Sequence, residues 1–555
     1  MWKSGFLIAV LAVAGCSRDS LPIDARLKNL FHDAELTPDE VRQALGRELR
    51  TARTSDAVFP TQGTLLEFYG KQRQSFAWCD PSGKILDRAQ LVLEALRRAG
   101  EHGLDPEDYA VGQLERLKQR IATASGDSAA LLADFDILTT AAFFRYASDV
   151  STGRVHPNEI RQDWHTNPPE LDLVGALASA VESDRLPDLL DRLPPPHEGY
   201  RRLREALKAL REVEAKGGWP AVPDGPKLER GSRGPRVVAM RQRLAAPAGP
   251  SDRYDAALAG AVASFQEVHG IEPDGKVGPA TLAELNVPVD RRIREIELNL
   301  ERWRWIPRDL GSPAVVVNIP GFELELVRKG APSWRTRIVV GKAYTPTPVF
   351  SDRIVGVLVN PPWNVPESIA VGEYLPELRE DSRALERQGL RLLEGSGDKA
   401  REVDPASVDW SRVDEGHFPF RIRQDPGPEN ALGKLKFELT NEFHVYLHDT
   451  PAAHLFDRTD RGRSHGCIRV EHPLELAERI LGEASREALS DALDQPEERR
   501  LPVKPPVSVH VLYWTAWVDE AGRLHFGPDL YEFDRAQMAA LEGSRAEIAG
   551  IPRSG

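Results

Sequence analysis

The spacing of apolar and polar residues changes along the chain and divides it into regions. From 47 to 218 apolar side chains recur at helical intervals, as at Leu86 and Leu93, and this spacing predicts a helical scaffold domain. Residues 131–150 are apolar around most of a helical circumference, so a central, buried helix is expected there. From 313 to 535 the period shortens to two, which predicts a mainly β domain.

A compact unit of three short helices is expected at 227–288, between those two regions. Val237, Met240 and Leu244 follow one another at i, i+3 and i+7, the spacing of a single apolar stripe. Short helices with one stripe each pack into a small bundle. A connecting helix at 289–312 is expected to join this bundle to the β domain.

The stretch 373–432 interrupts the β domain with charged, irregular sequence. An insertion of that length inside a β fold is usually functional, and we expect a capping lid. The chain is expected to end in a tail at 536–555. The predicted fold class is therefore multidomain: an α-helical scaffold, a three-helix bundle, and a mainly β domain with an inserted capping subdomain.

Composition agrees with a folded protein of several domains. The chain has 555 residues, of which 41% are apolar and 28% charged, so it exceeds the size of one ordinary domain. The formal net charge is −13. This charge, with no basic run longer than a few residues, argues against nucleic acid as the partner.

The N-terminal residues 1–15 are predicted to be a targeting segment rather than part of the fold. Lys3 precedes an apolar run that is too short to span a bilayer and has the length of a signal-peptide core. The run ends in Val-Ala-Gly-Cys16, which resembles a bacterial lipobox, in which the cysteine carries lipid. The alternative is an ordinary signal peptide with a chance cysteine. Residues 16–46, after the targeting segment, are expected to form a tether.

Export changes how the other two cysteines are interpreted. In an oxidising compartment Cys79 and Cys467 are either a disulfide or two thiols kept apart. Cys79 lies in SFAWCD beside aromatic residues, which suits a buried, inert thiol. Ser17 follows Cys16 and favours an anchor in the periplasmic face of the outer membrane, with the inner membrane as the alternative.

The short stretch SHGC carries the clearest candidate chemistry. A cysteine becomes a nucleophile when a nearby histidine stabilises its thiolate, and His444, His448, His454 and His465 all precede Cys467. Gly466 lets the backbone turn tightly and present N–H groups, the donors that a tetrahedral oxyanion needs. The alternative is a buried, structural cysteine.

A metal site is an alternative interpretation of these histidines. His444 and His448 stand at i and i+4, the spacing of two ligands on one helix face. HVYLH contains β-favouring residues and follows an alternating run, so a strand is predicted instead. On a strand these residues lie about 13 Å apart, too far for one ion. No metal is expected.

Longer segments resemble a known family. Residues 446–470, YLHDTPAAHLFDRTDRGRSHGCIRV, are similar to the active-site segment of the L,D-transpeptidases (ErfK/YbiS/YcfS/YnhG type). NPPWNVPESI (360–369) and RQDPGPENALGKLKF (423–437) resemble the large YcbB-like branch. GSRGPRV, SFQEVHG and DGKVGPATLAELN resemble the peptidoglycan-binding type 1 domain. Such a domain either binds the wall or is structural.

The resemblance implies roles for individual residues. Cys467 would be the nucleophile, and His448 would be the proton donor and acceptor that forms an ion pair with it. The backbone carbonyl of Asp449 would orient the His448 ring. His465 and the N–H groups of Gly466 and Cys467 would line the oxyanion region. Residues expected to bind substrate or face the cleft are Arg469, Ser464, Trp363 and Asn364.

The resemblance also implies a reaction. Cys467 would attack the carbonyl between the third residue of a peptidoglycan stem tetrapeptide and its terminal D-alanine, leaving a thioester. The side-chain amine of another stem's third residue would then form a cross-link, without a cofactor. Water, a protein lysine or an existing cross-link as the second reactant would give a carboxypeptidase, a lipoprotein-attaching enzyme or an endopeptidase. The alternative of another class is an inert, wall-binding structural lipoprotein.

The expected partners and location follow from the same resemblance. The chain is expected to act on peptidoglycan stem peptides in the periplasm and to contact the membrane through an N-terminal lipid. Nucleic acid is not expected as a partner, and the sequence names no further wall-synthesis partner.

Overall fold

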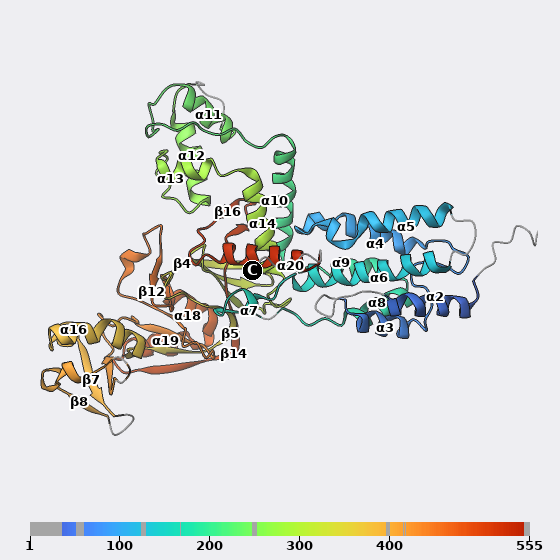
Figure 1. Cartoon of the computed structure of the whole chain (residues 1–555). Coiled ribbons are helices and arrows are strands. Elements are labelled where there is room, and N and C mark those ends of the chain that lie inside the picture. The colour runs from blue at the N-terminus through green and yellow to red at the C-terminus, as the bar shows by residue number, and fades with distance from the viewer. Residues whose placement is uncertain are drawn as a thin grey trace, which may run out of the picture.

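The computed structural model describes residues 36–51, 60–123, 129–166, 168–246, 252–395, 400–414, 416 and 418–548. A central β domain carries three extensions: the scaffold helices, a small helical bundle and a capping subdomain that includes β7 (Leu390–Glu394) and β8 (Arg401–Val403) (Figure 1). The predicted fold class is confirmed in all three parts. The expected lipidation site, Cys16, lies outside the described residues.

The scaffold is a bundle around one long, buried helix. That helix is α6 (Ala129–Thr152), whose Phe143 and Phe144 are fully buried, and it covers the whole region 131–150 in which a central helix was expected. The other helices of the bundle are α2 (Pro38–Thr51), α3 (Gln62–Lys71), α4 (Asp87–Arg97), α5 (Val111–Thr123), α8 (Leu173–Glu182) and α9 (Leu186–Arg192).

The tether expected at 16–46 ends earlier than predicted. Helix α2 begins at Pro38 and buries Val41, Leu45 and Leu49 in the scaffold core. These residues recur every four positions, so they form one apolar stripe along the helix. Polar residues separate these three apolar positions, so the sequence pattern did not predict the helix.

The scaffold region does not remain separate from the β domain. Strand β1 (Trp164–His165) leaves the helices and pairs with β5 (Val349–Val359) of the catalytic sheet. Helix α10 (Glu198–Ala215) packs against α14 (Val289–Trp303) through an apolar cluster that includes Leu203 and Leu300. The predicted domain 47–218 therefore contributes elements to two different cores. Helix α14 ends at Trp303, before the end of the connecting helix expected at 289–312.

The small bundle contains the three short helices that the spacing predicted. They are α11 (Pro235–Arg243), α12 (Ala256–Val268) and α13 (Pro279–Leu285). Asp255 caps α12 by accepting a hydrogen bond from the Leu258 N–H. The bundle lies at the upper end of the molecule in Figure 1, beyond α10 and α14.

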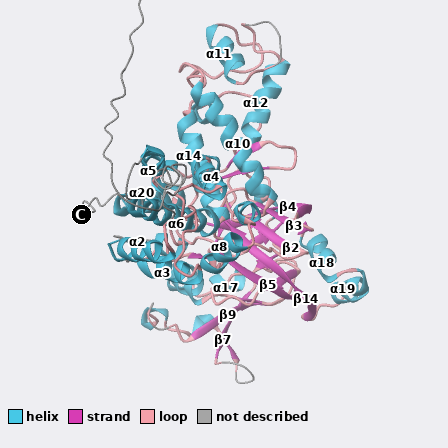
Figure 2. Cartoon of the chain, turned by 90° about the vertical axis from the view of Figure 1, so that its right-hand side faces the viewer, coloured by secondary structure: helices cyan, strands magenta, loops and turns pink. Residues whose placement is uncertain are grey.

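The strands of the β domain form a closed circuit. Their order is β5-β10-β11-β13-β4-β3-β2-β14, and β14 pairs back onto β5. The strands gather in one body with helices α18 (Pro473–Leu481) and α19 (Arg486–Leu493) beside it (Figure 2). Their bounds are β2 Ala314–Asn318, β3 Glu323–Arg328, β4 Ala331–Gly341, β10 Leu435–Glu438, β11 Leu447–His448, β12 Gly462–Ser464, β13 Ile468–Val470 and β14 Arg499–Leu512.

A short hairpin follows the last strand of the closed circuit. Strand β14 belongs to the closed circuit, and a separate hairpin follows it, made of β15 (Ala516–Val518) and β16 (Leu524–Phe526). Its turn includes Glu520 and Gly522, and Gly522 has a φ of 77°.

The insertion is an ordered subdomain with its own sheet rather than irregular chain. Its strands run in the order β6-β9-β7-β8, and it begins at Trp363, before the expected start of 373–432. Its core includes Leu375, Leu392 and Trp410. Its elements are β6 (Trp363–Asn364), α15 (Glu367–Ile369), a π-helical turn at Ala370–Tyr374, α16 (Leu375–Glu380), α17 (Ala384–Arg387), β7 (Leu390–Glu394), β8 (Arg401–Val403) and β9 (Phe420–Gln424).

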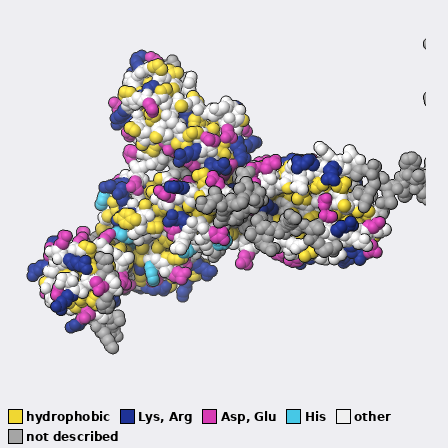
Figure 3. Space-filling view, viewed as in Figure 1, with side chains coloured by type: hydrophobic (Ala, Val, Ile, Leu, Met, Phe, Trp, Pro, Cys, Tyr) yellow, Lys and Arg dark blue, Asp and Glu magenta, His cyan; other side chains and the backbone are white. Residues whose placement is uncertain are grey.

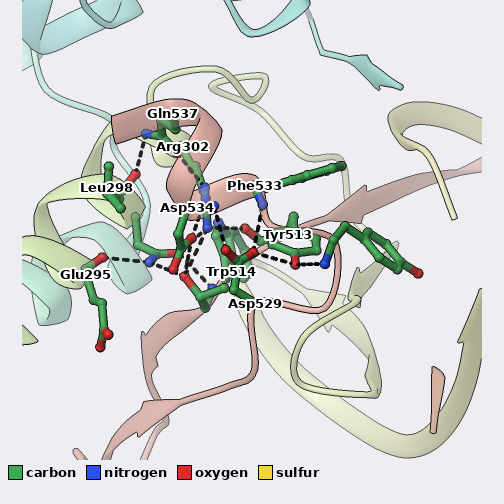
Figure 4. A network of polar contacts seen from close by, with 12 residues as sticks. Glu295, Leu298, Arg302, Tyr513, Trp514, Asp529, Phe533, Asp534 and Gln537 are labelled. Atoms are coloured by element: carbon green, nitrogen blue, oxygen red, sulfur yellow. Dashed lines mark hydrogen bonds and ion pairs between the residues drawn. The ribbon is translucent and has the colours of Figure 1, made fainter. Parts of the chain in front are cut away.

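The C-terminal residues 536–555 were expected to be a tail, and this prediction is wrong for their described part. Helix α20 (Phe533–Ile548) docks on α14 through a network around Arg302 (Figure 4). Arg302 donates hydrogen bonds to Gln537 at 2.8 Å and to Asp534 at 2.6 Å. A buried guanidinium needs such partners, so α20 completes the β domain.

The surface shows no strong separation of charge on the face seen in Figure 3, where basic and acidic side chains are interspersed. Within the described ranges, no helix combines the length and the apolar character that crossing a membrane requires.

Candidate active site

Strand register brings the predicted catalytic residues to one face of the closed sheet. β11 pairs with β13 in parallel, so that Leu447 lies opposite Ile468 and His448 opposite Arg469. The side chains of Leu447 and Ile468 are fully buried and point into the core. Because side chains alternate along a strand, His448 and Arg469 point outward, and Cys467 immediately precedes β13 on the same outer side.

The turn before the nucleophile is fixed by its own hydrogen bonds. Gly466 has a φ of 109°, a backbone conformation that residues other than glycine rarely adopt. Ser464 is 2% exposed, donates a hydrogen bond to the Cys467 carbonyl at 2.5 Å and accepts one from the Gly466 N–H at 3.1 Å. The Ser464 hydroxyl forms both of its hydrogen bonds within the turn. It is therefore not available for the contact with substrate that was expected of it.

The oxyanion region differs from the prediction in one donor. The Gly466 N–H already donates to Ser464, so it is not available to a substrate oxygen. The Cys467 N–H makes no hydrogen bond within the described part of the chain, so it remains free to donate to an oxyanion.

Cys467 is a half-buried, free thiol in a polar surrounding. Burial raises the pKa of this thiol above its usual value. The backbone N–H and the hydroxyl of Tyr446 oppose that rise, as do the positive charges of Lys436 and Arg469. The thiolate therefore has donors and cations around it, although burial disfavours it at rest.

His448 has the orienting contact that the resemblance implied. Its Nδ1 lies 2.5 Å from the Asp449 backbone carbonyl, so Nδ1 carries the proton and Nε2 is left as an acceptor. Burial and the charge of Arg469 lower the pKa of His448 to about 3. Near neutral pH the imidazole is uncharged, which leaves it able to accept a proton.

The expected ion pair between Cys467 and His448 is not supported in the resting protein. The pKa of the thiol is raised and that of the imidazole is lowered to about 3, so both groups are neutral near pH 7. The physical reason is burial, which disfavours each charged form.

His465 makes a contact with the capping subdomain rather than with the nucleophile. Its Nε2 lies 2.5 Å from Oε1 of Glu373, which belongs to the π-helical turn at Ala370–Tyr374. This contact links the turn that carries Cys467 to the cap.

Trp363 and Asn364, which were expected to face the cleft, form strand β6 of the capping sheet. They pair with Gln424 and Arg423 of β9, and Trp363 packs against the core of the cap. The described contacts do not bring either side chain to Cys467.

Two residues of the site were missed at the level of sequence. Tyr446 contacts the thiol, and Lys436 lies opposite His448 across β10 and β11. The alternation of HVYLH places Tyr446 on the side of His448, and that signal could have identified it. Lys436 comes from another strand, and only the strand register reveals its position.

The structure also bears on the disulfide and metal alternatives. Cys79 is buried and free, as Cys467 is free, so the disulfide alternative is wrong. Burial, and next Asp136, raise the pKa of the Cys79 thiol far above its usual value. In the residues that the structure describes, no three His, Cys, Asp or Glu side chains gather as metal ligands would.

A cavity of about 730 Å³ lies away from Cys467, against the outer side of β2 and β3. Its walls include Trp303 and Trp514, which stack with ring centroids 4.2 Å apart. Charged groups in its lining pair with one another, as Arg335 does with Glu325. None of the predicted catalytic residues lines it, so the chemistry is assigned to the sheet face at Cys467.

A polar cysteine beside a carbonyl-anchored, neutral histidine is the arrangement of cysteine-dependent acyl-transfer enzymes. Comparison with known families makes the assignment specific. Residues 312–509 match the family model described as "L,D-transpeptidase catalytic domain". Residues 233–285 match "Putative peptidoglycan binding domain", and residues 63–207 match "Scaffold domain". Residues 312–509 thus match an L,D-transpeptidase catalytic domain, which confirms the predicted resemblance; the YcbB-like branch stays a prediction.

Similar individual proteins cover parts of the chain. A protein of Haemophilus influenzae named "Putative L,D-transpeptidase" is 34% identical over 244 residues, which are 44% of this chain and 48% of that protein. The matched region thus spans about half the length of this curated relative. The crystal structure of the L,D-transpeptidase from Xylanimonas cellulosilytica DSM 15894 is 17% identical, covers 52% of this chain and 99% of that chain, and has a TM-score of 0.17.

Proposed function

We propose that this protein is a peptidoglycan L,D-transpeptidase that links third residues of two stem peptides through a thioester on Cys467. The observation that carries the proposal is the position of Cys467 on the outer sheet face with His448, whose Nε2 is free to accept a proton. The catalytic-domain match supports the reaction class.

The first half-reaction forms the thioester. His448 Nε2 takes the proton of Cys467 as the sulfur attacks the carbonyl between the third residue and the terminal D-alanine. The Cys467 N–H donates to the resulting oxyanion. The C–N bond then breaks, and His448 returns the proton to the departing D-alanine amine.

The second half-reaction forms the cross-link. The side-chain amine of an acceptor's third residue attacks the thioester and passes a proton to His448. The C–S bond breaks, and the Cys467 sulfur recovers the proton. The cap lies against the nucleophile turn through Glu373 and His465, and such a cover limits the access of water to the thioester.

The remaining domains and the N-terminus suggest where this reaction takes place. We propose that the bundle α11–α13 holds the enzyme near peptidoglycan, since it matches a peptidoglycan-binding model. We also propose that Cys16 is lipidated and anchors the chain in the periplasm, in the outer membrane's inner leaflet. The lipobox resemblance supports this anchor.

Turnover of a defined substrate tests the proposal. Purified protein is incubated with disaccharide-tetrapeptide, and the products are identified by mass spectrometry, with Cys467→Ala as the variant and Cys79→Ala as the matched control. A dimer joined through third residues is expected from the wild type and Cys79→Ala only. Tripeptide alone would show a carboxypeptidase, and identical products from Cys467→Ala would exclude the proposed chemistry.

A further inference from the structure

Two cations flank Cys467 without an acidic partner. Lys436 lies on the outer face of β10, opposite His448, and Arg469 follows on β13, on the other side of β11. In the described part of the chain, neither side chain forms a hydrogen bond or an ion pair with another residue, and the buried Nε of Arg469 has no acceptor. Within the described residues, no carboxylate therefore pairs directly with either cation.

The position of Lys436 is defined by an aromatic ring. Its Nζ lies 3.9 Å from the centroid of the Tyr446 ring, a distance typical of a cation–π contact. Tyr446 precedes His448 by two residues, and its hydroxyl interacts with Cys467. Through this ring the ammonium is held beside the nucleophile instead of moving freely in solvent.

Both cations are partly removed from water. Burial lowers the pKa of Lys436, while the charges of the Cys467 thiolate, when it forms, and of Glu438 and Glu498 oppose this shift. Burial likewise lowers the pKa of Arg469, and the thiolate form of Cys467 opposes it. Half-buried cations with no counterion have incomplete solvation, and a bound anion would complete it.

The proposed donor carries an anion at the appropriate place. Its C-terminal carboxylate is separated from the scissile carbonyl carbon by only the amide nitrogen and one Cα, hence by about 4–5 Å. The carboxylate on the third residue's side chain is separated from the same carbon by several more bonds. The terminal carboxylate is therefore the anion that lies nearest to Cys467 during attack.

We infer that Lys436 and Arg469 form a carboxylate subsite beside Cys467 that binds the C-terminal carboxylate of the donor stem peptide. This inference rests on the proposed function, and it makes Lys436 a residue that selects a donor with a free terminal D-alanine. Charge-assisted hydrogen bonds of this kind are worth about 10- to 100-fold in kcat/KM.

Donor analogues distinguish the sources of the anion. The kcat/KM is measured for a tetrapeptide donor with a free C-terminus, for its C-terminal amide, and for a donor amidated on the third residue's side-chain carboxylate. With wild type, the C-terminal amide is expected to lower kcat/KM about 10- to 100-fold, and the side-chain amide to have little effect. A loss confined to the side-chain amide would overturn the assignment.

Variants attribute the preference to Lys436. In Lys436→Met the ratio of free-acid to amide donor is expected to fall toward one, whereas Lys436→Arg should retain most of it. Lys434→Met is the matched control, because Lys434 is an exposed lysine two residues away, in the turn before β10, and wild-type preference is expected. If Lys436→Met lowers kcat/KM equally for all donors, the lysine serves only the thiolate and the inference is wrong. Thermal melting checks that each variant is folded.

A binding measurement separates this inference from the proposed function. In a Cys467→Ala background, which cannot react, calorimetry compares the affinities of the free-acid and amide donors with and without Lys436→Met. Tighter, Lys436-dependent binding of the free acid supports the subsite even if the wild type forms no cross-link. Equal affinities would overturn the subsite even if the wild type is an active transpeptidase.

Discussion

At the scale of the residue, the nucleophile turn combines a neutral thiol with a neutral base. Burial raises the pKa of Cys467 and lowers that of His448 to about 3. The thiolate then forms when substrate is in place and the proton moves to the Nε2 of His448. The hydroxyl of Tyr446 and the charge of Lys436 lower the cost of that step.

The pH dependence of alkylation measures this resting state. Iodoacetamide reacts with the thiolate, so its rate follows the pKa of the thiol. Because the pKa of Cys467 is raised and His448 is neutral above about pH 3, alkylation of Cys467 is expected to be at least about 100-fold slower at pH 6 than at pH 9. Peptide mass spectrometry separates Cys467 from Cys79. A rate that stays constant from pH 5 to 8 would instead indicate an ion pair.

The backbone of Gly466 offers a second prediction. A Cβ at a φ of 109° strains the turn by about 1–3 kcal/mol and displaces the Cys467 N–H. Gly466→Ala is therefore expected to lower kcat/KM by about tenfold or more, measured by cross-link formation. Gly427→Ala is the control, since an added Cβ there meets no atom within 4 Å. Wild-type kcat/KM in Gly466→Ala would show that the turn tolerates a side chain.

The sequence predicted the nucleophile turn better than its surroundings. Cys467 and Gly466 are adjacent, so their chemistry is visible in the local order of residues. His448 required the family resemblance, because 18 residues lie between it and Cys467. Lys436 could not be predicted, since its place depends on the pairing of β10 with β11. The ion pair was implied by the same resemblance, whereas burial in the folded protein disfavours the charged form of each group.

At the scale of the element, helix α20 is held by the buried charge of Arg302, which is distant in sequence and lies beside the helix only in the folded protein. Arg302 of α14 is 3% exposed and reaches Asp534 and Gln537 of α20 and the Tyr513 carbonyl. No local pattern near residue 536 shows that an arginine more than two hundred positions earlier needs these partners. A tail was therefore predicted where a structural helix lies.

Removing one partner of this network measures its contribution. Asp534→Ala leaves the Arg302 guanidinium without its carboxylate and is expected to lower the free energy of unfolding by about 3 kcal/mol. Arg535→Ala, on the same helix and 84% exposed in its side chain, should change it by less than about 0.5 kcal/mol. Urea unfolding followed by circular dichroism gives both values. Equal, small effects would mean that α20 is dispensable.

At the scale of the whole molecule, a tryptophan from the scaffold region packs into the core of the β domain. Trp164 is 2% exposed and packs edge-on against Trp305, with ring centroids 5.0 Å apart. It also stacks on Phe533. The fold class was predictable from hydrophobic periodicity, but this crossing of domain boundaries was not, because β1 has only two residues.

Truncation of this tryptophan tests the coupling of the two domains. Trp164→Ala is expected to destabilise the protein by about 3–5 kcal/mol and to lower the unfolding midpoint of scaffold and β domain together. Trp517→Ala removes a half-buried ring from the β15–β16 hairpin and should cost less. A scaffold transition that is unchanged in Trp164→Ala would show that the domains unfold independently.

The central claim, that Cys467 carries the acyl group, is tested most directly by intact-protein mass spectrometry. The protein is mixed with a tetrapeptide donor in the absence of acceptor and quenched in acid. The account predicts a mass increase equal to the donor minus D-alanine, located on Cys467 by peptide mapping and absent in Cys467→Ala. An unchanged mass, while D-alanine is released, or an adduct on another residue would contradict the account.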